Sequence, residues 1–148
     1  MYRAVLLFLV FIPICGCIKE KIDRKVINTD QAPQAIGPYS QAIQVGKQIF
    51  LSGQIAIDPN TGAFIPGGIK EQTQQVLKNI QAVLHVSDFN MQDIVQVQIF
   101  LTDMNNYGVV NQIYAAYFNE EPPARAVVQV ARLPKDALIE IMVSAIKT

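Results

Sequence analysis

Cysteine is almost absent from this sequence. The 148 residues include two cysteines, Cys15 and Cys17, and both lie within the first 17 positions. The remainder of the chain therefore has no thiol. This excludes a disulfide framework, a thiolate nucleophile and a cysteine-ligated zinc site from the globular region.

The sequence has a single histidine and no formal net charge. His85 is the single histidine, which excludes histidine-based triads and paired-histidine metal sites. Its place near the end of a predicted helix favours a partly exposed side chain near the terminal carbonyls over a catalytic role. The 12 basic and 12 acidic side chains balance, and no Lys/Arg cluster occurs, so electrostatics gives no support for a nucleic-acid partner. The glycine-rich motifs of nucleotide-binding folds are also missing.

The N-terminus has a pattern of its own. Met1-Tyr2-Arg3 is a short basic start, and residues 4–14 form a mostly apolar run that is too short for a comfortable membrane span but suits a signal-peptide core. The run ends in Ile14-Cys15-Gly16-Cys17, which resembles the bacterial lipoprotein box, although Cys15 replaces the usual small residue. The pattern predicts a lipoprotein-type signal over residues 1–17 with acylation of Cys17. The alternatives are an uncleaved N-terminal anchor and a cytosolic protein.

The next eight residues are mostly charged and separate this segment from the rest. Residues 18–25 predict a tether that would reach roughly 25 to 30 Å when fully extended. Stable membrane attachment would need more than one acyl chain on Cys17. A single domain is then expected over residues 26–148, which is long enough to bury a core.

Periodicity within this domain changes between two and about 3.6 residues. Strands are expected at residues 26–28, 42–45, 48–57 and 94–101, and helices over about 69–85 and 109–118, with Asn111 near the start of the second. Two further strands follow after residue 123. The order strand, strand, strand, helix, strand, helix, strand, strand predicts an α+β fold in which two helices cover one face of a mixed six-stranded sheet.

The last two predicted strands carry two charges that need an explanation. Arg125 opens the first strand, a short Leu-Pro-Lys-Asp turn follows, and Glu140 lies between apolar residues of the second strand. A carboxylate in such surroundings requires a partner, a proton or a bound water. The planar guanidinium of Arg125 matches a carboxylate, so the two residues could pair with each other or serve a ligand.

Four separated motifs carry information beyond periodicity and charge. The sequence closely resembles the Rid family (RidA/YjgF) from about residue 26 to the end, and the motifs occur in register along the chain. They are Ala35-Ile36-Gly37-Pro38-Tyr39-Ser40-Gln41-Ala42, Leu51-Ser52-Gly53-Gln54-Ile55, Pro122-Pro123-Ala124-Arg125-Ala126, and Val130-Ala131-Arg132-Leu133-Pro134-Lys135-Asp136 with Ile139-Glu140-Ile141.

The resemblance implies a homotrimer with a chorismate-mutase-like fold and active sites in clefts between subunits. It also implies hydrolysis of reactive 2-imino or enamino acids, such as 2-aminoacrylate, to a 2-keto acid and ammonia, without a cofactor or metal. Family members are usually cytosolic, so a cytoplasmic location is the alternative to export and anchoring through Cys17.

The resemblance also implies roles for individual residues. Arg125 would bind the substrate carboxylate, and Glu140 would position the attacking water and shuttle its proton. The pocket would be lined by Tyr39, Ser52 and Asn111, with Gly53 allowing close approach of the backbone. A packed aromatic ring remains the alternative for Tyr39, and a helix cap the alternative for Asn111.

Two positions depart from the family pattern. Val127 stands where many deaminating members carry a cysteine, and Met142 where they carry an acidic residue. A thiol therefore has no part in the expected chemistry. Two other functions stay open: a non-catalytic trimer that binds small carboxylates, which would keep Arg125 but not require Glu140, and a ribonuclease or translation inhibitor.

Overall fold

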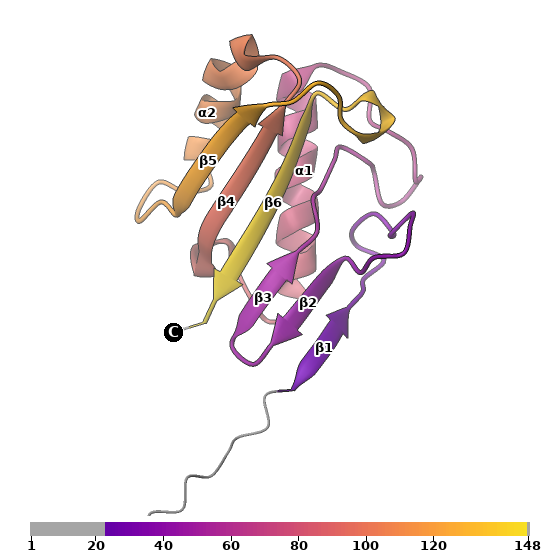
Figure 1. Cartoon of the computed structure of the whole chain (residues 1–148), viewed down its shortest axis with the longest axis vertical. Coiled ribbons are helices and arrows are strands. Elements are labelled where there is room, and N and C mark those ends of the chain that lie inside the picture. Colours follow the sequence, from indigo (N-terminus) through magenta and orange to yellow (C-terminus); the bar gives the residue numbers. More distant parts are fainter. Residues whose placement is uncertain (1–22, 148) are drawn as a thin grey trace, which may run out of the picture.

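A six-stranded sheet is the central element of the computed structural model, which describes residues 23–147 (Figure 1). The strand order is β1-β2-β3-β6-β4-β5, and all neighbours are antiparallel except the parallel pair β4 and β5. The strands are β1 (Arg24–Ile27), β2 (Ala42–Val45), β3 (Gln48–Leu51), β4 (Ile94–Leu101), β5 (Ala124–Gln129) and β6 (Ile139–Ile146).

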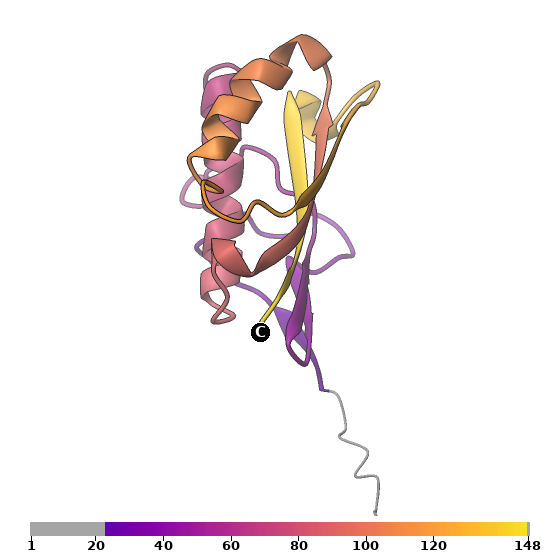
Figure 2. The same cartoon turned by 90° about the vertical axis from the view of Figure 1, so that its left-hand side faces the viewer.

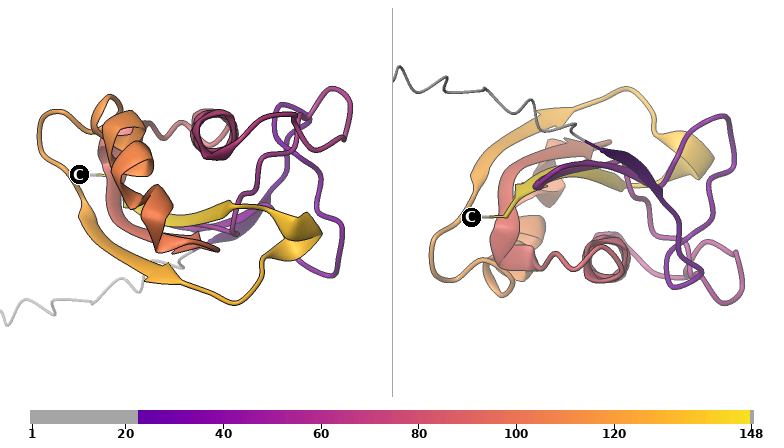
Figure 3. Two further views of the ribbon diagram at one scale, coloured as in Figure 1. Left: turned by 90° about the horizontal axis from the view of Figure 1, so that it is seen from above. Right: turned by 90° about the horizontal axis from the view of Figure 1, so that it is seen from below.

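Two helices, α1 (Ile69–His85) and α2 (Tyr107–Ala115), cover one face of the sheet, so the domain has two layers (Figure 2). The sheet curves around these helices, and its other face remains open (Figure 3). Each helix connects two strands that run in the same direction, as expected for crossover units. The predicted α+β architecture, with a mixed six-stranded sheet and both helices on one face, is confirmed.

The core lies between α1 and the central strands. Apolar residues recur along α1 at spacings of three and four, which places them on one side of the helix. They meet alternate residues of β4 and β6, because successive strand residues point to opposite faces. Each fully buried aliphatic side chain contributes about 1.5 to 3 kcal/mol. The largest include Leu77, Ile80, Leu84, Ile99, Leu101, Ile139 and Ile141.

Several predicted boundaries move. β1 begins earlier than expected, at Arg24, and α2 begins at Tyr107. Asn111 is therefore in the middle of α2, and the N-cap position belongs to Asn106. The interpretation of Asn111 as a helix cap is wrong.

The connection from β5 to β6 also differs from a simple hairpin. The two strands are not neighbours, because β4 lies between them. The crossover through α2 brings β5 back parallel to β4, so the chain must pass over β4 before β6 begins. The predicted turn is present as a short 3-10 helix, Pro134–Asp136, with left-handed backbone at Lys135 and Asp136.

The predicted signal segment, most of the tether and the lipidation site Cys17 lie outside the described residues. Within residues 23–147, no helix is both long enough and apolar enough to traverse a bilayer.

Candidate active site

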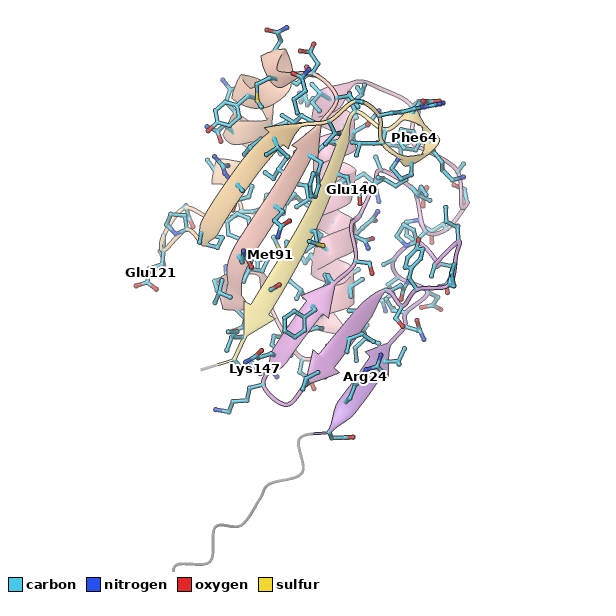
Figure 4. All side chains as sticks on the ribbon, viewed as in Figure 1. Arg24, Phe64, Met91, Glu121, Glu140 and Lys147 are labelled. Carbon is cyan, nitrogen blue, oxygen red and sulfur yellow. The ribbon has the colours of Figure 1, made fainter. Side chains whose placement is uncertain are left out.

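Glu140 projects from β6 onto the open face of the sheet, where Figure 4 labels it near the centre. Its neighbour across the ladder is Phe100 of β4. The side chain lines a pocket of about 390 Å³ whose walls are mostly apolar. Tyr39, Ser52 and Gly53 line the same pocket, so four of the predicted site residues come together there.

An irregularity between β3 and β6 forms the pocket wall beside Glu140. Phe50 pairs with Ser144, and the next bridge joins Gln54 to Ile141, so residues 51–53 lie opposite only residues 142 and 143. One extra residue on one side is a β-bulge, which bends the strand and redirects its side chains. The predicted strand over residues 48–57 therefore ends at Leu51.

The bulge places the backbone of Gly53 directly against the Glu140 carboxyl group. A Cβ atom at position 53 would lie 2.7 Å from Cδ and 3.0 Å from Cγ of Glu140, and would overlap Oε1. Only glycine leaves room for the carboxylate in its present position. The backbone at Gly53 thus lies against Glu140, and its role toward a substrate stays a prediction.

Burial governs the electrostatics of Glu140. No hydrogen bond or ion pair from residues 23–147 reaches its carboxylate, which is half-buried. Loss of solvent disfavours the charged form, so burial raises the pKa of Glu140 above its ordinary value. A carboxylate with a raised pKa and no partner is a stronger base than an ordinary one, which suits it to accept a proton.

Tyr39 and Ser52 are held by local hydrogen bonds at the pocket. The Tyr39 hydroxyl accepts from the backbone N–H of Ile36 at 3.3 Å, and the residue is 49% exposed, so it is not packed in the core of the described chain. The Ser52 hydroxyl donates to the Ser40 carbonyl at 2.7 Å. Ser52 therefore ties the loop of Tyr39 to the bulge.

Three buried amides, which sequence reasoning missed, support the loops around the pocket. The Gln41 side chain donates to the carbonyls of Thr29, Ala32 and Pro33. On α1, Asn79 donates to the carbonyls of Ile55 and Ile57, and Gln72 accepts from the N–H of Leu138. For Asn79 and Gln72, the sequence signal was an amide residue at a position on the side of α1 that faces the core.

Arg125 lies on the other side of the sheet from Glu140. It pairs in register with Val97, whose side chain faces the helices, whereas Glu140 pairs with Phe100 on the open face. The Arg125 guanidinium contacts two tyrosines of α2 and forms no ion pair with any residue of the described chain. A direct pair between Arg125 and Glu140 in one chain, the simplest structural explanation of these charges, is therefore wrong.

Asn111 belongs to the Arg125 side as well. It lies on α2 between Tyr107 and Tyr114, about one turn from each, and is not among the residues that line the Glu140 pocket. The six predicted residues thus form two groups in one chain. We call Tyr39, Ser52, Gly53 and Glu140 the pocket group, and Arg125 with Asn111 the edge group, because β5 is an edge strand.

The two residues that depart from the family pattern lie on opposite faces of the sheet. Met142 lines the pocket beside Glu140, and Val127 packs against the core two residues after Arg125.

His85 is exposed at the end of α1 and does not line the pocket. Residues 23–147 contain no group of three or more His, Cys, Asp or Glu side chains that could hold a metal ion.

Comparison with known proteins places these residues in a family. The profile of the family described as Endoribonuclease L-PSP matches residues 29–147. A "RutC family protein" of Pyrococcus horikoshii is 51% identical over 124 residues, covering 84% of this chain and 98% of the relative. The "2-iminobutanoate/2-iminopropanoate deaminase" of Mus musculus is 46% identical over 128 residues, covering 86% and 95% of the two chains.

A solved structure gives the same result in three dimensions. The crystal structure of a protein of unknown function of the conserved Rid protein family from Yersinia pestis superposes with a TM-score of 0.82 at 49% sequence identity. The match covers 84% of this chain and 100% of the other. As its four motifs predicted, the chain belongs to the Rid family, also described as the endoribonuclease L-PSP family.

Proposed function

We propose that this protein hydrolyses reactive 2-imino and enamino acids to 2-keto acids and ammonia. The observation that carries the proposal is the half-buried Glu140 carboxylate, which faces a pocket and has no partner among residues 23–147. A carboxylate placed only for stability would be paired or hydrogen-bonded. The activity for which the mouse relative is named, at 46% identity, supports the same reaction.

The chemistry requires few groups because the imine is already an electrophile. Arg125 binds the substrate carboxylate, which suits its planar fork. Water adds to the imine carbon while Glu140 accepts one of its protons, and the proton is then passed to the nitrogen. The hydroxyl group of this adduct then gives its proton to the nitrogen, and cleavage of the C–N bond releases ammonia and leaves the 2-keto acid. The raised pKa of Glu140 makes its carboxylate a stronger base toward the attacking water.

A complete site then needs two copies of the chain. The pocket group and the edge group lie on opposite faces of the sheet, so one chain cannot bring Arg125 and Glu140 to the same substrate. The open face also exposes large apolar side chains that are typical of an interface, namely Val26, Phe50, Val128 and Ile146. We therefore propose a homotrimer in which Arg125 of one subunit and Glu140 of the next bind the same substrate molecule from two sides.

Subunit mixing tests this arrangement. Arg125→Ala and Glu140→Gln should each abolish most of the 2-keto acid release from enzymatically generated 2-aminoacrylate. When the two inactive variants are unfolded and refolded together in equal amounts, activity should return to about a quarter of wild type, because each mixed ring contains one interface with both native residues. A site built within one chain would show no recovery. Each variant refolded alone is the control.

Glu140→Gln also separates the deaminase from a non-catalytic trimer that binds small carboxylates. Such a protein would not require Glu140, so wild type and variant would bind 2-oxobutanoate equally and neither would accelerate imine hydrolysis. A ribonuclease or translation inhibitor is disfavoured by the balance of 12 basic and 12 acidic residues. RNA binding with a steep salt dependence would revive it.

The N-terminal pattern supports a second, separate proposal about location. Acylation of Cys17 after removal of residues 1–16 would export the domain and attach it to a membrane, and a cytoplasmic protein is the alternative. Incorporation of labelled fatty acid into the full-length chain in bacteria tests this. The label should disappear in Cys17→Ser and persist in Cys15→Ser. The same labelling result in both variants would contradict the assignment.

A further inference from the structure

Two tyrosines of α2 enclose the Arg125 guanidinium. Tyr107 and Tyr114 are seven residues apart and therefore lie on the same side of the helix, where both contact Arg125 of β5. The guanidinium carbon is 4.5 Å from the centre of the Tyr114 ring and 5.8 Å from the centre of the Tyr107 ring. Arg125 Nη2 also donates to the Tyr107 hydroxyl at 3.2 Å. These contacts hold the cation from two directions.

An unrestrained arginine would bind a carboxylate poorly. Its side chain has many rotamers, and a bidentate contact requires one orientation of the planar fork. A protein carboxylate could restrain the arginine, but it would also neutralise the charge that the substrate needs. The aromatic face and the phenol hydroxyl restrain the guanidinium and leave its positive charge uncompensated. In agreement, Arg125 has no acidic partner within residues 23–147.

Tyr114 is itself fixed and uncharged. Its ring packs against Phe118 with centroids 4.4 Å apart, and the residue is 5% exposed. Its hydroxyl is buried and has no hydrogen-bond partner in the described part of the chain. Burial raises the pKa of Tyr114 to about 12, although the nearby Arg125 charge opposes this rise. The ring therefore presents a neutral face to the guanidinium at physiological pH.

We propose that Tyr107 and Tyr114 are positioning residues that hold the Arg125 guanidinium in the orientation that receives the substrate carboxylate. The role rests on the proposed function of Arg125. Tyr114 acts through its ring and Tyr107 through its hydroxyl, so each has a distinct conservative substitution. Neither tyrosine is required to touch the substrate.

Binding of 2-oxobutanoate to the full-length protein, followed by titration calorimetry, tests the proposal. Tyr114→Leu removes the ring and should weaken binding about tenfold, whereas Tyr114→Phe keeps the ring and should restore the wild-type Kd. Tyr107→Phe loses only the hydroxyl and should weaken binding about threefold. In steady-state assays these losses should appear in KM, with kcat nearly unchanged, because the anchor acts equally in ground and transition states. Tyr117→Leu, a tyrosine without an Arg125 contact, is the matched control.

A spectroscopic measurement shows whether the effect passes through Arg125. In wild type, ring currents should shift the Arg125 Nε–H resonance, which is assigned by its loss in Arg125→Lys. The shift should collapse in Tyr114→Leu and persist in Tyr114→Phe. If Tyr114→Leu and Tyr107→Phe bind 2-oxobutanoate as wild type does, the positioning role is wrong. If binding behaves as expected but wild type does not hydrolyse imines, the deaminase proposal fails while the positioning role stands.

Tyr107→Phe keeps the test decisive if Tyr114→Leu does not fold. Tyr107 is 38% exposed, so losing its hydroxyl leaves the core intact. A folded Tyr107→Phe variant with wild-type Kd and an unchanged Arg125 resonance would overturn the part of the proposal that concerns the hydroxyl.

Discussion

Gly53→Ala should impair catalysis without harming the fold. The added methyl carbon would lie 2.7 Å from Cδ of Glu140. Non-bonded carbon atoms prefer separations of about 3.5 Å or more, so Cδ would have to retreat by at least about 0.8 Å, and Oε1, which the methyl group overlaps, by more. The backbone at Gly53 is outside the left-handed region, so alanine is compatible with its conformation. The strain falls on the Glu140 side chain, which can rotate away.

The displacement is large on the scale of catalysis. A shift of about 1 Å in a catalytic group can lower the rate about 100-fold, which corresponds to about 2.7 kcal/mol in the barrier. We therefore expect kcat/KM for 2-aminoacrylate hydrolysis to fall by about two orders of magnitude in Gly53→Ala. The far-ultraviolet circular dichroism spectrum should be that of the wild type.

Two comparisons make this measurement decisive. Gly108→Ala adds the same methyl group where no atom lies within 4 Å, and it should keep its activity and gain about 0.5 to 1 kcal/mol of stability as a helical alanine. In a Glu140→Gln background, Gly53→Ala should cost little further activity, because the group that it displaces has already been disabled. An active Gly53→Ala enzyme, or a full additional loss in that background, would refute the argument.

Three further predictions concern the charges and the strained turn. Arg125→Ala should lower kcat/KM at least 100-fold while the protein stays folded. A folded variant with wild-type activity would show that Arg125 does not bind the substrate. Because burial raises the pKa of Glu140 in the folded state, the wild type loses stability as pH rises through that pKa. Glu140→Gln should therefore raise Tm relative to wild type more at pH 7 than at pH 3.5, and a pH-independent difference would contradict the raised pKa. Lys135 has φ 56°, so Lys135→Gly should add about 0.5 to 1 kcal/mol of stability, measured as a higher urea midpoint, and a lower midpoint would show that the turn is unstrained.

Much of the architecture could be predicted because the local patterns were strong. The alternation of residues 94–101 and the stripe that begins at Ile69 correspond closely to β4 and α1. The pocket group followed from motifs, and the structure brings Tyr39, Ser52, Gly53 and Glu140 together. The separation of Arg125 from Glu140 was not predicted from residue patterns, because strand order and register depend on long-range pairing.

The bulge at residues 51–53 could not be predicted from the sequence either, because it also depends on long-range pairing. An alternating apolar pattern continues from Ile49 through Leu51 and beyond, so local periodicity predicted one long strand. The interruption depends on how Gln54 pairs with Ile141 of β6, far away in the chain. The buried amides of Gln41, Gln72 and Asn79 are similar, since their partners are loop backbone groups that no periodicity identifies.

The separation of Arg125 and Glu140 within one chain has a chemical consequence for the proposed trimer. A direct pair would lower the pKa of Glu140 and occupy the fork of Arg125, which would remove both properties that the reaction uses. In the proposed site, the substrate carboxylate neutralises Arg125 and excludes water, and both changes should raise the pKa of Glu140 further. Since kcat/KM reports the free enzyme and kcat the bound complex, the acid limb of the kcat profile should lie at higher pH. The opposite order would mean that the substrate does not bind between these two groups.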